Sequence, residues 1–216
     1  MVEIPWTPIH EPIFLDLDDG ITCCVLRLPA NPRNNSISNV TLAHSEERMT
    51  PQRKEQHAAG RFCLSEASRK EGITGQISLS ENFPLRLETS NGMVPVSISH
   101  SDSLAVAVIG KGYSQIGVDL EPKERQIRNS ILDQFCTPEE IDSLSNESSD
   151  YHRLNVWMAK EAVSKATGQG MATAKQIKID GEFAGYQSKN YRLFQNEFEN
   201  HFIMIAVPYS DSSIES

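Results

Sequence analysis

The sequence predicts an α+β fold built from two similar halves. Three observations support this prediction: strand-like alternation in several segments, two long helical patterns, and a short internal similarity. Segment 62–70, "FCLSEASRK", aligns with segment 157–165, "WMAKEAVSK", with an aromatic residue, Glu-Ala and a final Lys in register. A duplication of this kind places a cleft between the halves. We therefore expect two pseudo-symmetric halves, 1–112 and 113–216, each a small, mostly antiparallel sheet packed on helices.

Local patterns define the elements in chain order. Residues 11–28 are strand-like around an Asp19-Gly20 turn, and Thr50-Pro51 is a typical cap for a helix that continues to about Lys70. Residues 93–109 predict two strands around a Ser-Asp-Ser turn, and Gln115 to Glu121 predict another, stopped by Pro122. Thr137 to Glu140 form a capping box before the next helix. Residues 175–208 return to strand patterns, whereas 29–39, 143–150 and the last residues are expected to be loops or tail.

Composition excludes several classes of protein. The chain has 216 residues with a net charge of −9, which argues against a nucleic-acid partner. No apolar run approaches the roughly 20 residues of a membrane span, so we expect no membrane association. The N-terminus lacks a basic segment followed by an apolar core, which argues against a signal peptide. The four cysteines have no metal-finger spacing, so a reduced cytoplasmic setting fits best.

Segment 157–166, "WMAKEAVSKA", has the pattern of an amphipathic helix with charge on one side. At about 100° per residue, one side carries Trp157, Lys160, Glu161, Ser164 and Lys165. The other side is an apolar stripe of Ala159, Ala162, Val163 and Ala166. Gly168 follows as a plausible cap. The charged side is either a solvated face with a Glu161–Lys165 pair or a binding face.

Segment 116–122, "IGVDLEP", predicts a strand with two acids on one face. Because strand side chains alternate, Ile116, Val118 and Leu120 face the core, and Gly117, Asp119 and Glu121 face the other side. Two neighbouring carboxylates suit either open solvent or a hard divalent cation such as Mg²⁺. Gly117 would leave room for a ligand to approach the backbone.

Two further segments carry groups that bind phosphate. Segment 96–101, "VSISHS", supplies alternating hydroxyls and His100, although Ser99 and His100 point apart on a strand and make a poor nucleophile–base pair. Arg53, His57 and Arg61 lie on one face of the predicted helix 50–70, and arginine suits phosphomonoesters. Taken singly, each segment is also consistent with an ordinary core or a solvated surface.

Together, these segments resemble the 4′-phosphopantetheinyl transferase superfamily. "IGVDLEP" and "WMAKEAVSKA", some forty residues apart, are similar to its paired signature G-[IV]-D-x-E and [FW]-x-x-K-E-[AS]-x-x-K, and "SISHS" is similar to its Ser-His motif. The "HAAGR" segment and the chain length resemble the monomeric, two-half branch that activates surfactin and enterobactin synthetases. The resemblance covers residues from about 50 to 170.

The resemblance implies a reaction and its participants. Members of the family transfer the phosphopantetheine arm of coenzyme A to a serine of an apo acyl or peptidyl carrier protein, with Mg²⁺, and release adenosine 3′,5′-bisphosphate. The resemblance therefore implies a holo-[carrier-protein] synthase that acts as a monomer. It also implies that the N-terminal half holds the 3′-phosphate and adenine side of coenzyme A, and that the C-terminal half holds Mg²⁺ and the catalytic motifs.

The resemblance also assigns roles to individual residues. Asp119, Glu121 and Glu161 fall on the metal positions, and Glu161 is also the implied general base. Lys165 falls on the lysine that neutralises charge on the diphosphate, and Asp119, Glu161 and Lys165 form the implied catalytic set. The implied coenzyme A contacts are Arg53, Arg61, Arg86, Ser99, His100, Lys160 and Lys165. Arg86 is included as a substitute for the Gly-[KR]-Pro motif that relatives carry before the His.

Other interpretations remain open from the sequence. The basic residues Lys123, Arg125 and Arg128 could meet an acidic carrier-protein helix or form a solvated linker. The same acids could serve another Mg²⁺-dependent phosphotransferase or pyrophosphohydrolase, which would turn over nucleotide without a carrier protein. A non-catalytic carrier-binding scaffold is the third possibility, and it has no need for the acids and Lys165 in one arrangement.

Overall fold

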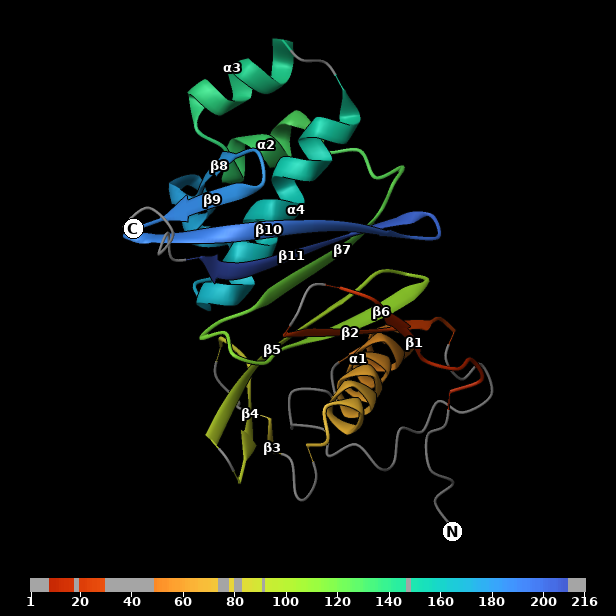
Figure 1. Ribbon diagram of the computed structural model, residues 1–216. Helices are drawn as coiled ribbons and strands as arrows, with labels where there is room; N and C mark the ends of the chain where they lie inside the picture. The colour runs from red at the N-terminus through yellow and green to blue at the C-terminus, as the bar shows by residue number, and fades with distance from the viewer. Residues whose placement is uncertain are drawn as a thin grey trace.

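The computed structural model contains two antiparallel sheets with helices on their outer faces (Figure 1). It describes residues 8–17, 20–29, 49–73, 78–79, 83–90, 92–146 and 149–209. Most of the predicted loop 29–39 and the predicted tail after Tyr209 lie outside the described residues. Within the described part of the chain, no helix is long and apolar enough to cross a membrane.

The first sheet has six strands and the second has five, and all neighbouring strands are antiparallel. Across the first sheet the order is β1 (Ile13–Leu15), β2 (Ile21–Arg27), β6 (Leu104–Gly110), β5 (Gly92–His100), β4 (Arg86–Thr89) and β3 (Ser78–Leu79). Across the second it is β7 (Gly117–Pro122), β11 (His201–Tyr209), β10 (Lys189–Phe198), β9 (Phe183–Tyr186) and β8 (Lys178–Asp180). The α+β fold in two halves is therefore confirmed, whereas the domain boundary after residue 112 stays a prediction.

Four layers follow from where the helices pack. Helix α1 (Pro51–Lys70) covers the outer face of the first sheet, and α4 (Asp150–Thr167) covers the outer face of the second (Figure 1). The remaining helical segments, α2 (Asn129–Phe135), α3 (Pro138–Asn146) and the short 3₁₀ helix η2 (Met171–Gln176), belong to the α4 side. The inner faces of the two sheets pack against each other and enclose a third apolar core.

Strand alternation explains how one strand can serve two cores. In β6 the side chains of Leu104, Val106 and Val108 enter the core between the sheets, while Ala105, Ala107 and Ile109 enter the core beneath α1. Ile116, Val118 and Leu120 likewise lie in the core between the sheets, as predicted. The opposite face of β7 is therefore directed toward α4.

Gly117 is the point of closest approach between β7 and α4. A Cβ atom built at this position would lie 1.9 Å from the carbonyl oxygen of Ala162 and 2.7 Å from the amide nitrogen of Ala166. The prediction that Gly117 leaves space for a ligand is therefore wrong, because the helix backbone fills that space. The absence of a side chain lets α4 lie directly on β7, next to Asp119.

Helix caps match the sequence signals in most places. The Thr50 side chain accepts from the amide of Arg53, and Pro51 is the first residue of α1. The Thr137–Glu140 capping box forms, with the Thr137 amide donating to Glu140 and the Glu140 amide donating to Thr137. The loop predicted for 143–150 is wrong at its start, because α3 continues to Asn146. Gly168 caps α4 with φ of 73°, a left-handed conformation that glycine adopts at little cost.

Candidate active site

A large cavity lies where β5 of the first sheet meets β7 of the second. Its volume is about 780 Å³, and helices α1 and α4 supply further walls. Both halves therefore contribute to one site. The polar residues that line it are Arg53, Gln56, Ser97, Ser99, His100, Ser101, Asp102, Asp119, Glu121, Arg125, Glu161 and Lys165, with Trp157 and Phe83 among the apolar ones.

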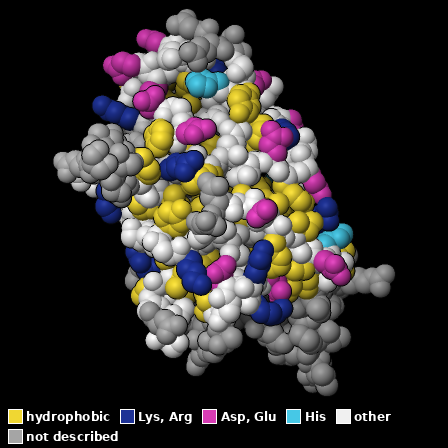
Figure 2. All heavy atoms as spheres, viewed as in Figure 1, with side chains coloured by type: hydrophobic (Ala, Val, Ile, Leu, Met, Phe, Trp, Pro, Cys, Tyr) yellow, Lys and Arg dark blue, Asp and Glu magenta, His cyan; other side chains and the backbone are white. Residues whose placement is uncertain are grey.

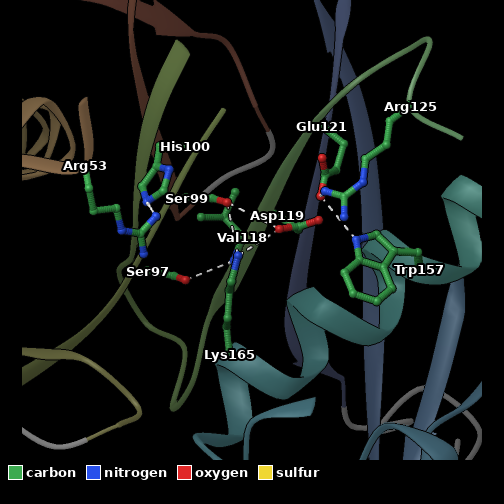
Figure 3. Close-up of polar contacts among 10 residues, drawn as sticks. All are labelled: Arg53, Ser97, Ser99, His100, Val118, Asp119, Glu121, Arg125, Trp157 and Lys165. Atoms are coloured by element: carbon green, nitrogen blue, oxygen red, sulfur yellow. Dashed lines mark hydrogen bonds and ion pairs between the residues drawn. The ribbon is translucent and has the colours of Figure 1, made fainter. Parts of the chain in front are cut away.

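Lys165 lies at the centre of the site and bridges the two sheets (Figure 3). Its ammonium group donates to Asp119 Oδ1 on β7 at 2.8 Å and to Ser99 Oγ on β5 at 3.0 Å. The Ser99 hydroxyl also donates to Asp119 Oδ1, at 3.3 Å. The Asp119 side chain is 6% exposed and the Lys165 side chain 27% exposed, so the lysine remains accessible from the cavity.

A second group, Glu121 with Arg125 and Trp157, forms the other end of the cavity (Figure 3). Glu121 pairs with the Arg125 guanidinium and accepts from Trp157 Nε1 at 3.1 Å. The guanidinium also lies 5.1 Å from the centre of the Trp157 ring, within the range of a cation–π contact. Burial is the main cause of a raised pKa at Glu121, and repulsion by Asp119 adds to it, while Arg125 and Trp157 act in the opposite direction.

The opposite end of the cavity carries a cation, Arg53, and one acid, Asp102. Arg53 Nη1 on α1 lies 2.7 Å from His100 Nε2 on β5, so the guanidinium donates and the imidazole accepts. Burial, followed by the charges of Arg53 and Lys165, lowers the pKa of His100 to about 4. The imidazole is therefore neutral at pH 7, and an anion bound here would meet the Arg53 charge directly.

Glu161 lies on the α4 side of the cavity, one turn before Lys165. Burial raises the pKa of its carboxyl group, and repulsion by Asp119 and Glu121 adds to this, while the Lys165 charge opposes it. Three carboxylates, at 119, 121 and 161, therefore influence one another electrostatically in a single cavity.

The carboxylate oxygens of Asp119, Glu121 and Glu161 are suitable ligands for a hard cation. Asp119 Oδ2 is buried and has no hydrogen-bond partner among the described residues, and a buried carboxylate oxygen in that state is costly without a cation or a donor. Within the described ranges, however, no three His, Cys, Asp or Glu side chains are grouped closely enough to hold a metal ion. The Mg²⁺ ligand set of Asp119, Glu121 and Glu161 therefore stays a prediction.

Lys160 does not line the cavity, contrary to the predicted helix face. Its side chain is 0% exposed, and its ammonium group pairs with Glu140 at 2.8 Å. The backbone carbonyls of Phe135 and Ala174 accept from it at 3.2 and 3.1 Å. On α4, Lys160 and Lys165 are about 140° apart around the axis, so the two lysines lie at opposite edges of the charged stripe. A direct contact between Lys160 and a ligand in this cavity is inconsistent with this position.

Two other residues from the predicted coenzyme A set lie outside the cavity lining. Arg61 contacts the His57 ring one turn earlier on α1. Burial and the flanking Arg61 and Arg53 charges lower the pKa of His57 to about 4. Arg86 donates to the carbonyl of Ser114 at 3.0 Å, on the connection between β6 and β7. Their contribution to ligand binding stays a prediction.

Several cavity residues are outside the predicted catalytic, coenzyme A and metal sets. The Ser97 hydroxyl accepts from the backbone amide of Val118 at 3.0 Å and so joins the two halves instead of facing an anion. Arg125 was grouped with an exposed basic segment, yet it points to Glu121, and Lys123 from the same segment pairs with Glu197. Gln56 lies one turn after Arg53 on α1, a spacing that could have indicated its place beside the cavity.

Charged side chains of both signs are mixed on one face of the molecule. Figure 2 shows acidic and basic side chains interspersed on the face viewed there. The net charge of −9 therefore does not produce a continuous acidic patch on this face, and the positive groups of the cavity act locally.

Comparisons with known proteins agree with this arrangement. Residues 115–206 match a family model described as the 4′-phosphopantetheinyl transferase superfamily. The chain is also similar to the 4′-phosphopantetheinyl transferase HetI of Nostoc sp. (strain PCC 7120 / SAG 25.82 / UTEX 2576), with 35% identity over 88 residues. That match covers 38% of this chain and spans only 36% of the length of HetI.

Residues 115–206, less than half of the chain, therefore resemble the 4′-phosphopantetheinyl transferase superfamily. They include β7 with Asp119 and Glu121, and α4 with Glu161 and Lys165. The matched region thus contains one half of the cavity. The other half comes from β5, with Ser99 and His100, and from α1, with Arg53.

Proposed function

We propose that this protein transfers the 4′-phosphopantetheine moiety of coenzyme A to a serine of an apo carrier protein. The observation that carries the proposal is the position of Lys165, which lies between Ser99 of one half and Asp119 of the other, on the same helix as Glu161. A diphosphate bound in this cavity would meet fixed cations and carboxylates from both halves. Phosphoryl transfer depends mainly on such positioning and charge neutralisation.

In the proposed reaction, the serine hydroxyl oxygen attacks the phosphorus atom that carries the pantetheine arm. A new bond forms between the serine oxygen and phosphorus, the bond to the bridging oxygen of the diphosphate breaks, and adenosine 3′,5′-bisphosphate leaves. Glu161 accepts the proton of the serine hydroxyl. Lys165 neutralises the charge that develops on the leaving phosphate.

The cation end of the cavity is proposed to bind the nucleotide phosphate. Arg53 supplies a fixed charge, and the neutral His100 ring keeps the guanidinium directed into the cavity. We propose that Asp119 and Glu161, with Glu121, hold Mg²⁺, and the buried unpartnered oxygen of Asp119 fits that role. When bound, Mg²⁺ would supply charge neutralisation for the diphosphate oxygens. We further propose that the protein acts as a monomer, because one chain supplies both walls of the cavity. The cytoplasmic location is proposed from the cysteine pattern alone.

The proposal is tested by the intact mass of apo carrier proteins incubated with coenzyme A, Mg²⁺ and this protein. We expect one carrier of a panel of acyl and peptidyl carriers to gain a single phosphopantetheine group. Glu161→Gln and Asp119→Asn should each slow this gain about 100-fold or more with the fold retained. Glu88→Gln, at an exposed position on β4, is the matched control and should behave as the parent.

Two outcomes would contradict the proposal. Modification at the parent rate by Glu161→Gln would remove the assigned base. Cleavage of the coenzyme A diphosphate without any carrier, and with no carrier modified, would instead indicate a pyrophosphohydrolase.

A further inference from the structure

His201, the first residue of β11, joins the second sheet to the β5–β6 turn of the first sheet. The residue is 6% exposed. Its Nε2 atom lies 3.0 Å from Ser101 Oγ and 3.3 Å from Ser103 Oγ, two hydroxyls on that turn. In sequence, His201 is about one hundred residues from its partners, and nothing in the segment "ENHFIMIAVP" indicates a link to the first half.

The hydrogen bonds around Ser101 favour one direction for this contact. The backbone amides of Ser103 and Leu104 both donate to Ser101 Oγ, at 3.3 and 3.1 Å. The single hydroxyl proton of Ser101 is then available to donate to His201 Nε2. If Ser101 donates, His201 is neutral with its proton on Nδ1, an atom that is buried and has no hydrogen-bond partner among the described residues. Burial, which lowers the pKa of His201, favours the neutral ring.

The turn that His201 holds is part of the cavity wall. His100, Ser101 and Asp102 all line the cavity. From the other side, Gln56 Nε2 on α1 donates to the Ser101 carbonyl at 3.0 Å, and Gln52 Nε2 donates to Asp102 Oδ1 at 3.1 Å. The turn is thus held by α1 of its own half and by β11 of the other half.

Ser101, directly after β5, is also the last of three alternating serines that contact the second half. Ser97 accepts from the Val118 amide, and Ser99 contacts Asp119 and Lys165. The first two contacts lie along β7, whereas the contact of Ser101 reaches β11. His201 therefore extends the junction of the two halves to the end of the cavity that carries His100 and Arg53.

We propose that His201 is a positioning residue whose Nε2 accepts from Ser101 and thereby fixes the His100–Ser103 turn relative to β7 and α4. This inference rests on the proposed function for its effect on catalysis, because the turn carries part of the nucleotide-binding end. His201 itself does not touch the reacting atoms. Loss of the contact should loosen the position of His100 and Arg53 and weaken coenzyme A binding more than it slows the chemical step.

Kinetics of carrier modification test the proposal with matched variants. His201→Phe keeps the ring volume and removes the acceptor, and it should raise KM for coenzyme A about tenfold, the equivalent of one hydrogen bond, with kcat within about twofold of the parent. His201→Gln supplies an amide oxygen as acceptor and should restore most of the affinity. Ser101→Ala should reproduce the His201→Phe effect, and the double variant should be no worse than either single one. Ser145→Ala, on α3, is the control and should match the parent.

A measurement without turnover separates this inference from the proposed function. The nitrogen NMR resonances of the His201 ring should report a proton on Nδ1 in the parent, and Ser101→Ala should change the Nε2 resonance. A proton on Nε2 at neutral pH would overturn the inference, as would a parent-like KM in both His201→Phe and Ser101→Ala. If the parent modifies no carrier, the proposed function fails, and the NMR result still decides whether His201 holds the turn.

Discussion

Two lysines on helix α4 differ in what surrounds them, although both pair with an acid. Lys160 is fully buried, and four acceptor atoms surround its ammonium group: both oxygens of Glu140 and two backbone carbonyls. Lys165 has two acceptors, Ser99 and Asp119, and a side chain that is 27% exposed to the cavity. A lysine whose donors are all satisfied holds structure together, whereas one with a donor available can serve a ligand.

The difference arises from the elements packed on each side of the helix. The capping box at the start of α3 places Glu140 over Lys160, and α2 and η2 contribute the carbonyls. On the other side, Gly117 allows α4 to lie against β7, so Lys165 reaches both Asp119 and Ser99. Neighbouring backbone, more than residue type, therefore decides the role of each lysine.

The largest expected effect is on transfer activity when the cavity lysine is lost. Lys165→Met should reduce kcat for carrier modification about 100- to 1000-fold, because a fixed charge beside the leaving phosphate is removed. The free energy of unfolding should fall by less than on loss of Lys160, because Lys165 is 27% exposed and Asp119 keeps the Ser99 hydroxyl as a donor. Stopped assays with intact mass as the readout, together with urea unfolding, separate the two quantities. Near-parent kcat would contradict the role given to Lys165.

Loss of the buried lysine should show the opposite pattern. Lys160→Met should lower the free energy of unfolding by about 2–4 kcal/mol, because Glu140 and two buried carbonyls lose their donor. The variant that remains folded should keep kcat within a few fold of the parent. If Lys160→Met instead kept the stability of the parent and lost coenzyme A binding, Lys160 would have a ligand-binding role and not a structural one.

Acidic pH should lower the free energy of unfolding, because two histidines of the first half are neutral in the folded protein. The pKa values of His57 and His100 are both lowered to about 4, against an ordinary value near 6.5 in the unfolded chain. Between pH 6.5 and 4 the unfolded state binds more protons, so stability is present above pH 6.5 and is lost as the pH falls. We expect the free energy of unfolding to drop about 1–2 kcal/mol from pH 7 to pH 5, after allowance for solvent screening.

Paired unfolding curves at the two pH values provide this measurement. The double variant His57→Gln/His100→Gln should flatten the dependence between them. An unchanged pH dependence in that variant would show that other groups cause the loss.

The smallest effect is expected at an exposed ion pair, which sets the baseline for the comparison. Arg69 pairs with Glu66 on α1 at 2.8 Å, and the Arg69 side chain is 72% exposed. Arg69→Ala should change the free energy of unfolding by less than about 0.5 kcal/mol. A loss comparable to that of Lys160→Met would mean that burial does not distinguish these pairs.

The sequence predicted the elements better than the contacts between them. Strand alternation correctly directed Ile116, Val118 and Leu120 to the core, and helix periodicity correctly buried the alanine stripe of α4. Tertiary packing gives Lys160 and Lys165, on the charged side of α4, different surroundings. The sequence could not predict this, because no local pattern indicates that Glu140 covers Lys160. The role of Gly117 and the contact of His201 with Ser101 depend on chain segments that meet only in the folded protein, so neither has a local signal.

Hydrogen exchange of the parent protein with and without coenzyme A tests the central claim most directly. The account predicts slower amide exchange on ligand binding in both halves together, at residues 97–102 of the first sheet and at 117–122 and 157–165 of the second. Protection confined to one half, or located away from the β5–β7 junction, would contradict a site shared between the two sheets.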